Sequence, residues 1–313
     1  MPSDRPKKLK FARIRHAFAW CVVLWMRAVV LLPLRWQIVL GKALGRAVGR
    51  LWAQRRRVAE INIAACFPSL PRAARDRLVR DHFAALGASF VEMAMGWFGN
   101  EETVRARIRV EGAEHLRAAQ ARGKGVILFA AHFTSLEFFW VALRPMCPRL
   151  SGMYKWQKNA VMNDVMNRAR MRYYDELLLK DNIRRLLRNL EDNYVVWYAS
   201  DQRHTGKNSA LVPFFGVPAM TSTAISRIAK VSGAAVLPYY CRRVGDGAEY
   251  VMTILPPLAG FPSGDDARDA RELLKLLENY IELCPEQYFW THKRFKGRPA
   301  PLPDPYAPAR QTV

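Results

Sequence analysis

The sequence has 313 residues, of which 50% are hydrophobic and 11% are aromatic, and this composition excludes an intrinsically disordered chain. Its formal net charge of +22 requires an anionic partner, and nucleic acid, an anionic membrane face and an acidic carrier protein all qualify. The five cysteines show no CxxC spacing, which argues against a disulfide framework and against a zinc site.

The N-terminus combines a basic segment, residues 5–15, with an apolar stretch at residues 17–34. Arg27 interrupts this stretch and Pro33 lies near its end. About 20 apolar residues are needed to cross a bilayer. We therefore expect residues 1–35 to anchor the chain to a membrane, either by spanning it or by lying in its interface. The alternative is a buried hydrophobic helix of a soluble domain.

Residues 36–100 are predicted to be helical and to form a layer that faces the membrane. Apolar residues recur at a helical period between positions 73 and 97. The segment 66–71 contains two prolines and predicts a turn before this helix.

From residue 101 onward, short apolar or alternating runs take turns with helical patterns. The expected strands are 107–111, 126–131, 150–156, 194–200, 234–241 and 250–255. The expected helices are 113–120, 160–174, 183–191, 224–231 and 266–284. This alternation predicts an α/β domain over residues 101–300, with a mostly parallel central sheet flanked by helices, followed by a C-terminal tail at 301–313.

The first motif follows the apolar run 126–131 and contains His132 and Glu137. Ligands bind at the carboxyl ends of strands in open α/β sheets, so His132 is a candidate general base. A helix is expected to begin at about Thr134, with Glu137 in its first turn. Glu137 would then fix the imidazole tautomer and stabilise the imidazolium. The alternative is that Thr134 and Glu137 form only a helix-capping box.

The second motif is another apolar run, 195–200, that ends in Asp201 and Gln202. We expect both side chains to emerge at the same edge of the sheet as His132. The polar loop that follows carries Lys207, which can hold a phosphate group. An ordinary surface loop is the alternative.

The third motif, residues 285–296, interleaves aromatic and basic residues. That composition suits either stacking on nucleic-acid bases or an aromatic helix that anchors in the core and has a basic end at the membrane interface.

In this order the three motifs resemble the late acyltransferases of lipid A biosynthesis, the lauroyl/myristoyl acyltransferase family within the lysophospholipid acyltransferase superfamily. The spacing of His132 and Glu137 is shared with the wider superfamily, whereas the ending at 285–296 is more particular to the lipid A branch. The resemblance covers nearly the whole chain and includes the segments 34–36, 62–68, 96–98, 110–116, 123–126 and 212–216.

The resemblance implies a glycerolipid acyltransferase-like fold and an enzyme at the cytoplasmic face of the bacterial inner membrane. Such an enzyme transfers an acyl chain from acyl carrier protein to a hydroxyl of a lipid A precursor. His132 would be the base and Glu137 its partner, and no metal or bound cofactor is expected. The anionic membrane lipid is a further expected partner.

Some positions depart from the family pattern. Lys155 and Trp156 stand where the family commonly has Arg-Pro, and Lys keeps the charge but loses the bidentate fork of Arg. The substrate-binding residues are expected to be Lys155, Asp201, Gln202 and Lys207. Cations on two predicted helices are expected to dock acyl carrier protein: Arg168, Arg170, Arg172, Arg184, Arg185 and Arg188.

Two other functions remain open from the sequence. One is a glycerophospholipid or other lipid acyltransferase that uses acyl-CoA or acyl carrier protein. The other is a basic nucleic-acid-binding protein, which the net charge favours. The spread of cations over the whole chain and the apolar N-terminal run argue against it, so no nucleic-acid partner is expected.

Overall fold

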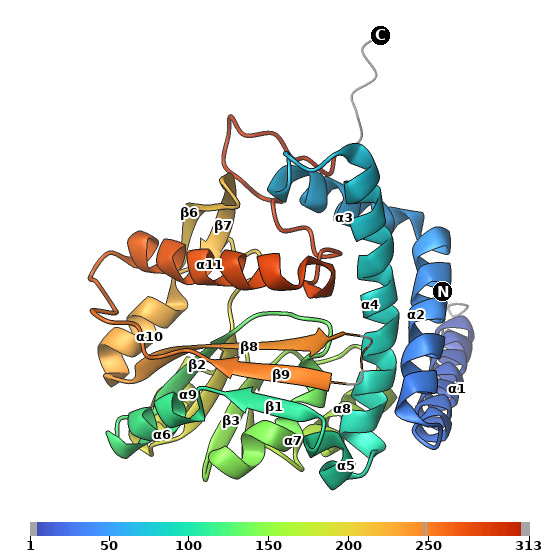
Figure 1. The fold of residues 1–313 in the computed structure, drawn as a ribbon, viewed down its shortest axis with the longest axis horizontal. Coiled ribbons are helices and arrows are strands. Elements are labelled where there is room, and N and C mark those ends of the chain that lie inside the picture. The colour runs from blue at the N-terminus through green and yellow to red at the C-terminus, as the bar shows by residue number, and fades with distance from the viewer. Residues whose placement is uncertain (1–4, 246, 248, 308–313) are drawn as a thin grey trace.

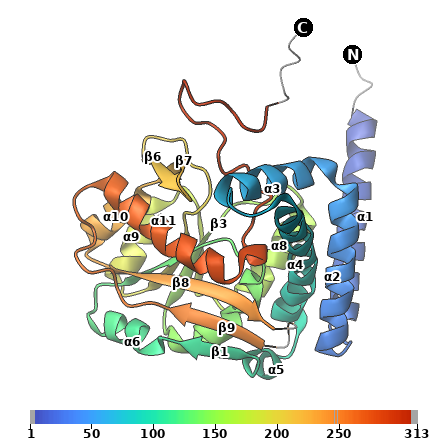
Figure 2. The same cartoon turned by 45° about the horizontal axis from the view of Figure 1, so that its top comes forward.

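A computed structural model describes residues 5–245, 247 and 249–307, with side chains from His16 onward. The side chains of the basic segment 5–15, and residues 308–313 of the C-terminal tail, lie outside the described part. A central sheet is covered by helices, and the N-terminal helices stand together at one side of it (Figure 1). The turned view of Figure 2 shows the same helices standing against the edge of the sheet as a separate layer.

The central sheet has seven strands in the order β1-β9-β8-β2-β5-β3-β4. β8, β2, β5, β3 and β4 run parallel, whereas β9 is antiparallel to β8 and pairs in parallel with β1. The mostly parallel sheet expected from the sequence is therefore confirmed. The strands are β1 (Ile108–Glu111), β2 (Val126–Ala130), β3 (Leu150–Tyr154), β4 (Glu176–Leu179), β5 (Val195–Ala199), β8 (Ala235–Val244) and β9 (Glu249–Ile254).

The continuous apolar run of β2 arises because both faces of the sheet are buried. Ile127 and Phe129 pack in the core on one face, and Val126 and Leu128 pack in the core on the other. The helices that flank the sheet are α5 (Glu101–Arg105), α6 (Ala113–Ala121), α7 (Trp140–Leu143), α8 (Ala160–Arg170), α9 (Ile183–Glu191), α10 (Ala224–Ser232) and α11 (Asp266–Leu283).

The sequence missed three short strands. β4 is a four-residue edge strand inside the segment between two expected helices. β6 (Ser209–Phe214) and β7 (Val217–Ser222) form a separate antiparallel hairpin. At its turn Phe215 and Gly216 both have positive φ, of 49° and 76°. Pro213 and Pro218 within the hairpin hid its strand character, because proline is disfavoured in strands.

The N-terminal layer consists of α1 (Arg5–Val29), α2 (Leu34–Leu51), α3 (Ala53–Cys66) and the long α4 (Arg72–Phe98). The expected helix between 73 and 97 and the turn before it are confirmed. The apolar stretch 17–34 is not one helix, because α1 ends at Val29 and Pro33 caps the start of α2. Within the described residues, no helix has the length and apolarity needed to cross a membrane.

Glycines allow α2 and α4 to pack at very short range. A Cβ added to Gly45 would lie 2.1 Å from the carbonyl oxygen of Phe83, and one on Gly87 would lie 2.0 Å from that of Gly41. A side chain at either position would force the helices apart. The remaining faces of α2 are exposed and carry both arginines and large apolar side chains.

A buried ion pair joins α4 to the sheet. Arg243 on β8 donates from Nη2 to Oε2 of Glu92 on α4 at 2.8 Å, and its Nε also contacts that carboxylate. The hydroxyl of Tyr250 on β9 donates to Oε1 of Glu92 at 2.8 Å. A buried charge is tolerated only when it is paired and hydrogen-bonded, so these contacts fix where α4 crosses the sheet.

Candidate active site

The parallel pairing of β2 and β5 brings two sequence motifs together. Ala130, the last residue of β2, lies beside Ala199, the last residue of β5. His132 and Asp201 each follow two residues later, at the carboxyl ends of neighbouring parallel strands. The sequence predicted that both would emerge at one edge of the sheet, and the structure places them there.

Asp201 is the carboxylate that holds His132. Its Oδ1 lies 2.6 Å from Nδ1 of the His132 ring, and its Oδ2 accepts from the backbone N–H of His132 at 3.1 Å. The Asp201 side chain is 1% exposed and that of His132 is 35% exposed. Because Asp201 occupies Nδ1, the Nε2 nitrogen is the one left to exchange a proton with a substrate.

The two groups shift each other's proton affinity. Burial lowers the pKa of His132, but the charge of Asp201 and its hydrogen bond outweigh burial, and the net pKa is raised. Burial raises the pKa of Asp201, but the charge and hydrogen bonds of His132 bring it below the ordinary value. The pair is therefore a carboxylate beside a more basic imidazole, as in other His-carboxylate pairs that act as general bases.

Among the described residues, no hydrogen bond or ion pair joins Glu137 to the His132 ring, and the carboxylate bonded to the ring is that of Asp201. The Glu137 carboxylate forms a buried ion pair with Arg170 on α8, whose Nε lies 3.2 Å from Oε1. It also accepts from the indole N–H groups of Trp97 and Trp140, at 3.1 and 3.2 Å. Burial raises the pKa of Glu137, but Arg170 and these hydrogen bonds lower it on balance.

The helix expected from Thr134 is also corrected. A 3-10 turn, η1 (Leu136–Phe138), leads into the short α7, and the Thr134 hydroxyl is buried without a partner. The capping box is therefore not formed. Instead, the backbone N–H of Thr134 donates a hydrogen bond to the backbone carbonyl of Gln287 at 2.8 Å.

The C-terminal motif passes beside the candidate base. After the 3-10 turn η3 (Pro285–Gln287) it continues as a non-helical segment, so the expected aromatic helix is wrong. The Phe289 N–H donates to the carbonyl of His132 at 3.1 Å, and Tyr288 forms a bridge with Phe133. Its aromatic side chains Tyr288, Trp290 and Phe295 are buried, which leaves them unable to stack on bases.

An apolar hollow of about 900 Å³ adjoins this segment. α1, α2 and α4 supply its apolar wall, and Gln202, Phe289, Thr291 and His292 also line it. The hollow has the size and mixed lining of sites that hold small ligands. Its apolar lining includes Val22, Trp25, Leu44, Val48, Leu86 and Phe90.

A second hollow, of about 660 Å³, lies farther along α4 and contains Glu137 and Arg170. Lys155 and Lys158 stand at its exposed side, together with Trp156. Lys155 is therefore near the Glu137 cluster, whereas Gln202 borders the first hollow. Lys207 lies exposed in the loop before β6, and its ammonium forms no ion pair with any described residue.

Arg170 is the site residue that the sequence misassigned, because it was grouped with cations for carrier docking. Its position is periodic with Met162 and Met166 on the buried side of α8, and that period was the available signal. Other members of the expected docking set are also engaged. Ion pairs join Arg168 to Asp164, Arg172 to Glu101, and Arg185 to Glu176.

Similarity to known proteins identifies the family of this chain. A family model described as bacterial lipid A biosynthesis acyltransferase matches residues 5–297. The chain is 32% identical to the lipid A biosynthesis lauroyltransferase of Escherichia coli K12 over 91% of its own length and 92% of that protein. It is 32% identical to the palmitoleoyltransferase of the same organism, over 93% and 94% of the two chains. It is 29% identical to the myristoyltransferase, over 95% and 92%. The chain belongs to the bacterial lipid A biosynthesis acyltransferase family.

Proposed function

We propose that this enzyme transfers a fatty acyl group from the thioester of acyl carrier protein to a hydroxyl of a lipid A precursor, with His132 as the general base. The observation that carries the proposal is that the buried Asp201 holds the imidazole of His132, whose backbone carbonyl accepts from Phe289, a residue that lines the apolar hollow. An acyl chain fits the apolar wall, and its reactive end then meets the polar residues beside His132.

In the proposed reaction, the acceptor's own hydroxyl is the nucleophile. His132 Nε2 takes the proton of that hydroxyl while its oxygen attacks the thioester carbonyl carbon. The Asp201 carboxylate stabilises the imidazolium that forms. The tetrahedral intermediate then expels the sulfur, which receives the proton from His132. An ester forms, a thioester breaks and a free thiol is released, so the base is regenerated.

We assign Glu137 a positioning role through Arg170. Their ion pair joins the segment after β2 to α8, and the two indole donors satisfy the rest of the carboxylate. Lys155 and Lys158, at the rim of the same hollow, provide positive charge for an anionic group of the acceptor. Gln202 contributes an amide near the reacting end, and Lys207 a further cation on the adjacent loop.

We propose that α1 and α2 dock the enzyme onto the cytoplasmic face of the inner membrane. The support is a group of large apolar side chains that are exposed along both helices and the turn between them: Phe18, Leu24, Leu31, Trp36, Val39 and Leu51. Monomeric soluble proteins rarely leave such side chains together in water. An interfacial position, with these side chains in the lipid, explains this surface.

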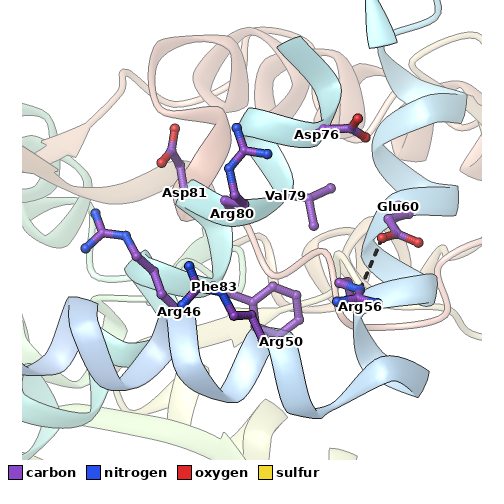
Figure 3. Close-up of a pocket in the computed structure, with 10 residues that line it drawn as sticks. Arg46, Arg50, Arg56, Glu60, Asp76, Val79, Arg80, Asp81 and Phe83 are labelled. Atoms are coloured by element: carbon purple, nitrogen blue, oxygen red, sulfur yellow. Dashed lines mark ion pairs between the residues drawn. The ribbon is translucent and has the colours of Figure 1, made fainter. Parts of the chain in front are cut away.

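Cations flank the exposed apolar surface. A hollow of about 560 Å³ between α2, α3 and α4 is lined by Arg46, Arg50 and Arg80, together with Asp76 and Asp81 (Figure 3). None of these three forms an ion pair with a described residue, whereas Arg56 in the same hollow is paired with Glu60. Cations beside an apolar face favour contact with anionic lipid headgroups, at about 1 kcal/mol for each.

The donor is tested by presenting one acyl chain on acyl carrier protein and on coenzyme A, with a labelled lipid A precursor as acceptor. We expect acylated precursor to form with the carrier-bound donor at a kcat/KM well above that for acyl-CoA. The His132→Ala variant should lose about 10²–10⁴-fold of this rate, because the base is gone. A preference for acyl-CoA and a glycerophospholipid acceptor would favour the alternative enzyme, and failure to acylate the precursor would contradict the proposal.

The roles of the two carboxylates are separated by isosteric amides. Asp201→Asn should keep the thermal unfolding midpoint within a few degrees and lower kcat by about 10²–10⁴-fold, because an amide cannot stabilise the imidazolium. Glu137→Gln leaves the Arg170 charge buried without a counterion, and should destabilise the fold by about 3–5 kcal/mol. The matched control, Glu137→Gln with Arg170→Gln, should recover part of that stability. An Asp201→Asn enzyme within a few-fold of the wild-type rate would refute this assignment.

Membrane docking is tested by sedimentation with vesicles that contain phosphatidylglycerol. Val39→Glu and Leu51→Glu each put a charge on the exposed face of α2, and each should weaken vesicle binding by roughly tenfold or more. Val231→Glu is the matched control, because Val231 is an equally apolar and exposed residue on α10. Activity in detergent should stay unchanged in all three variants. Equal binding by the α2 variants and the control would show that this surface does not meet the membrane.

A further inference from the structure

His292 lies beside the proposed base, and the chemistry described so far does not use it. The Phe289 N–H donates to the His132 carbonyl, and the His292 N–H donates to the Phe289 carbonyl at 3.3 Å. From α3, the buried Asn62 amide donates to the His292 carbonyl at 2.7 Å. These contacts hold the backbone of His292 in a fixed place relative to the end of β2.

The hydrogen bond to the His292 ring decides where its proton lies. The backbone N–H of Arg203 donates to Nε2 of His292 at 3.2 Å, and a backbone N–H can only donate. Nε2 is therefore an acceptor, and the neutral ring carries its hydrogen on Nδ1. Burial lowers the pKa of His292 to about 4, and the attraction of Asp201 only partly offsets burial. The ring is neutral near pH 7.

The Nδ1–H of His292 has no hydrogen-bond acceptor in the described part of the protein. The His292 side chain is only partly buried, so its surface remains accessible. His292 lines the apolar hollow together with Gln202 and Phe289. A fixed donor on the wall of an apolar hollow suits a ligand that has one oxygen at the end of a hydrocarbon chain.

We propose that the Nδ1–H of His292 binds the carbonyl oxygen of the acyl group and stabilises the negative charge that this oxygen gains during transfer. This inference rests on the proposed acyl transfer and adds a residue to it. When the acceptor oxygen bonds to the carbonyl carbon, the electron pair of the C=O bond moves to the carbonyl oxygen. The pair returns when the C–S bond breaks and the sulfur takes the proton held by His132. His292 donates a hydrogen bond throughout and transfers no proton.

A neutral donor has an advantage at this position. A charged imidazolium would oppose protonation of His132, which must itself become positive in the same step. Because His292 is neutral, its N–H dipole stabilises the developing oxyanion and does not oppose the protonation of His132. Fixed donors of this kind act strongly in apolar sites because no solvent must reorganise during the reaction.

The test uses two amides that divide the functions of the ring. Asparagine places its amide nitrogen near the position of Nδ1, so His292→Asn keeps the donor and loses the acceptor for Arg203. Glutamine places its amide oxygen near the position of Nε2, so His292→Gln keeps the contact with Arg203 and loses the fixed donor. Both variants are assayed for kcat and KM with the acyl carrier thioester and the lipid A precursor, and their unfolding midpoints are compared.

We expect His292→Gln to lose about 10²–10³-fold in kcat with little change in KM, and His292→Asn to stay within about tenfold of the wild type. A merely structural role, in which His292 anchors the loop at Arg203, predicts the reverse order. That reverse order, equal losses in both variants, or a fully active His292→Gln would overturn the proposal. If the wild type transfers no acyl group in the same assay, the proposed function fails, whereas wild-type transfer with an active His292→Gln removes only the role of His292.

Discussion

The pairing of β2 with β5 decides which carboxylate meets His132. Parallel register places Ala130 beside Ala199, so the residues two positions beyond each strand end share one edge of the sheet. Asp201 then lies within hydrogen-bond distance of both the ring and the backbone N–H of His132. A buried carboxylate requires compensation, and here the compensating group is the candidate base itself. The sheet therefore fixes the ring orientation, and the base needs no contact with Glu137.

The other buried charges extend this framework away from the base. Glu137 with Arg170 joins the segment after β2 to α8, and Glu92 with Arg243 joins α4 to β8. Both involve α4, because Glu92 lies on this helix and the Trp97 indole of the same helix donates to Glu137, and residues of α4 line both hollows. The pairs thus set the position of the helix that forms the wall of the substrate site. The arrangement accounts for an enzyme with a rigid reacting centre and an apolar helical layer that can face lipid.

Much of this fold could be predicted from local patterns. The buried strand before His132 and the helical period of α4 were both evident, because each depends on residues that are close in sequence. The hydrogen bond of Asp201 to the His132 ring could not be predicted, because Asp201 is far from His132 in sequence and comes near it in space only through the pairing of β2 with β5. Likewise, Arg170 was read as a surface cation, since its neutralisation by Glu137 is a tertiary contact that helix periodicity suggested only weakly.

The central claim is that Asp201 fixes the tautomer of His132 and raises its pKa. Nitrogen-15 NMR of the histidine-labelled enzyme measures both properties, and a His132→Gln variant assigns the resonance among the six histidines. The structure predicts a neutral ring with its hydrogen on Nδ1, a pKa above the ordinary value of 6.5, and a lower pKa in Asp201→Asn. A hydrogen on Nε2, or a pKa at or below 6.5 that does not respond to Asp201→Asn, would contradict the account.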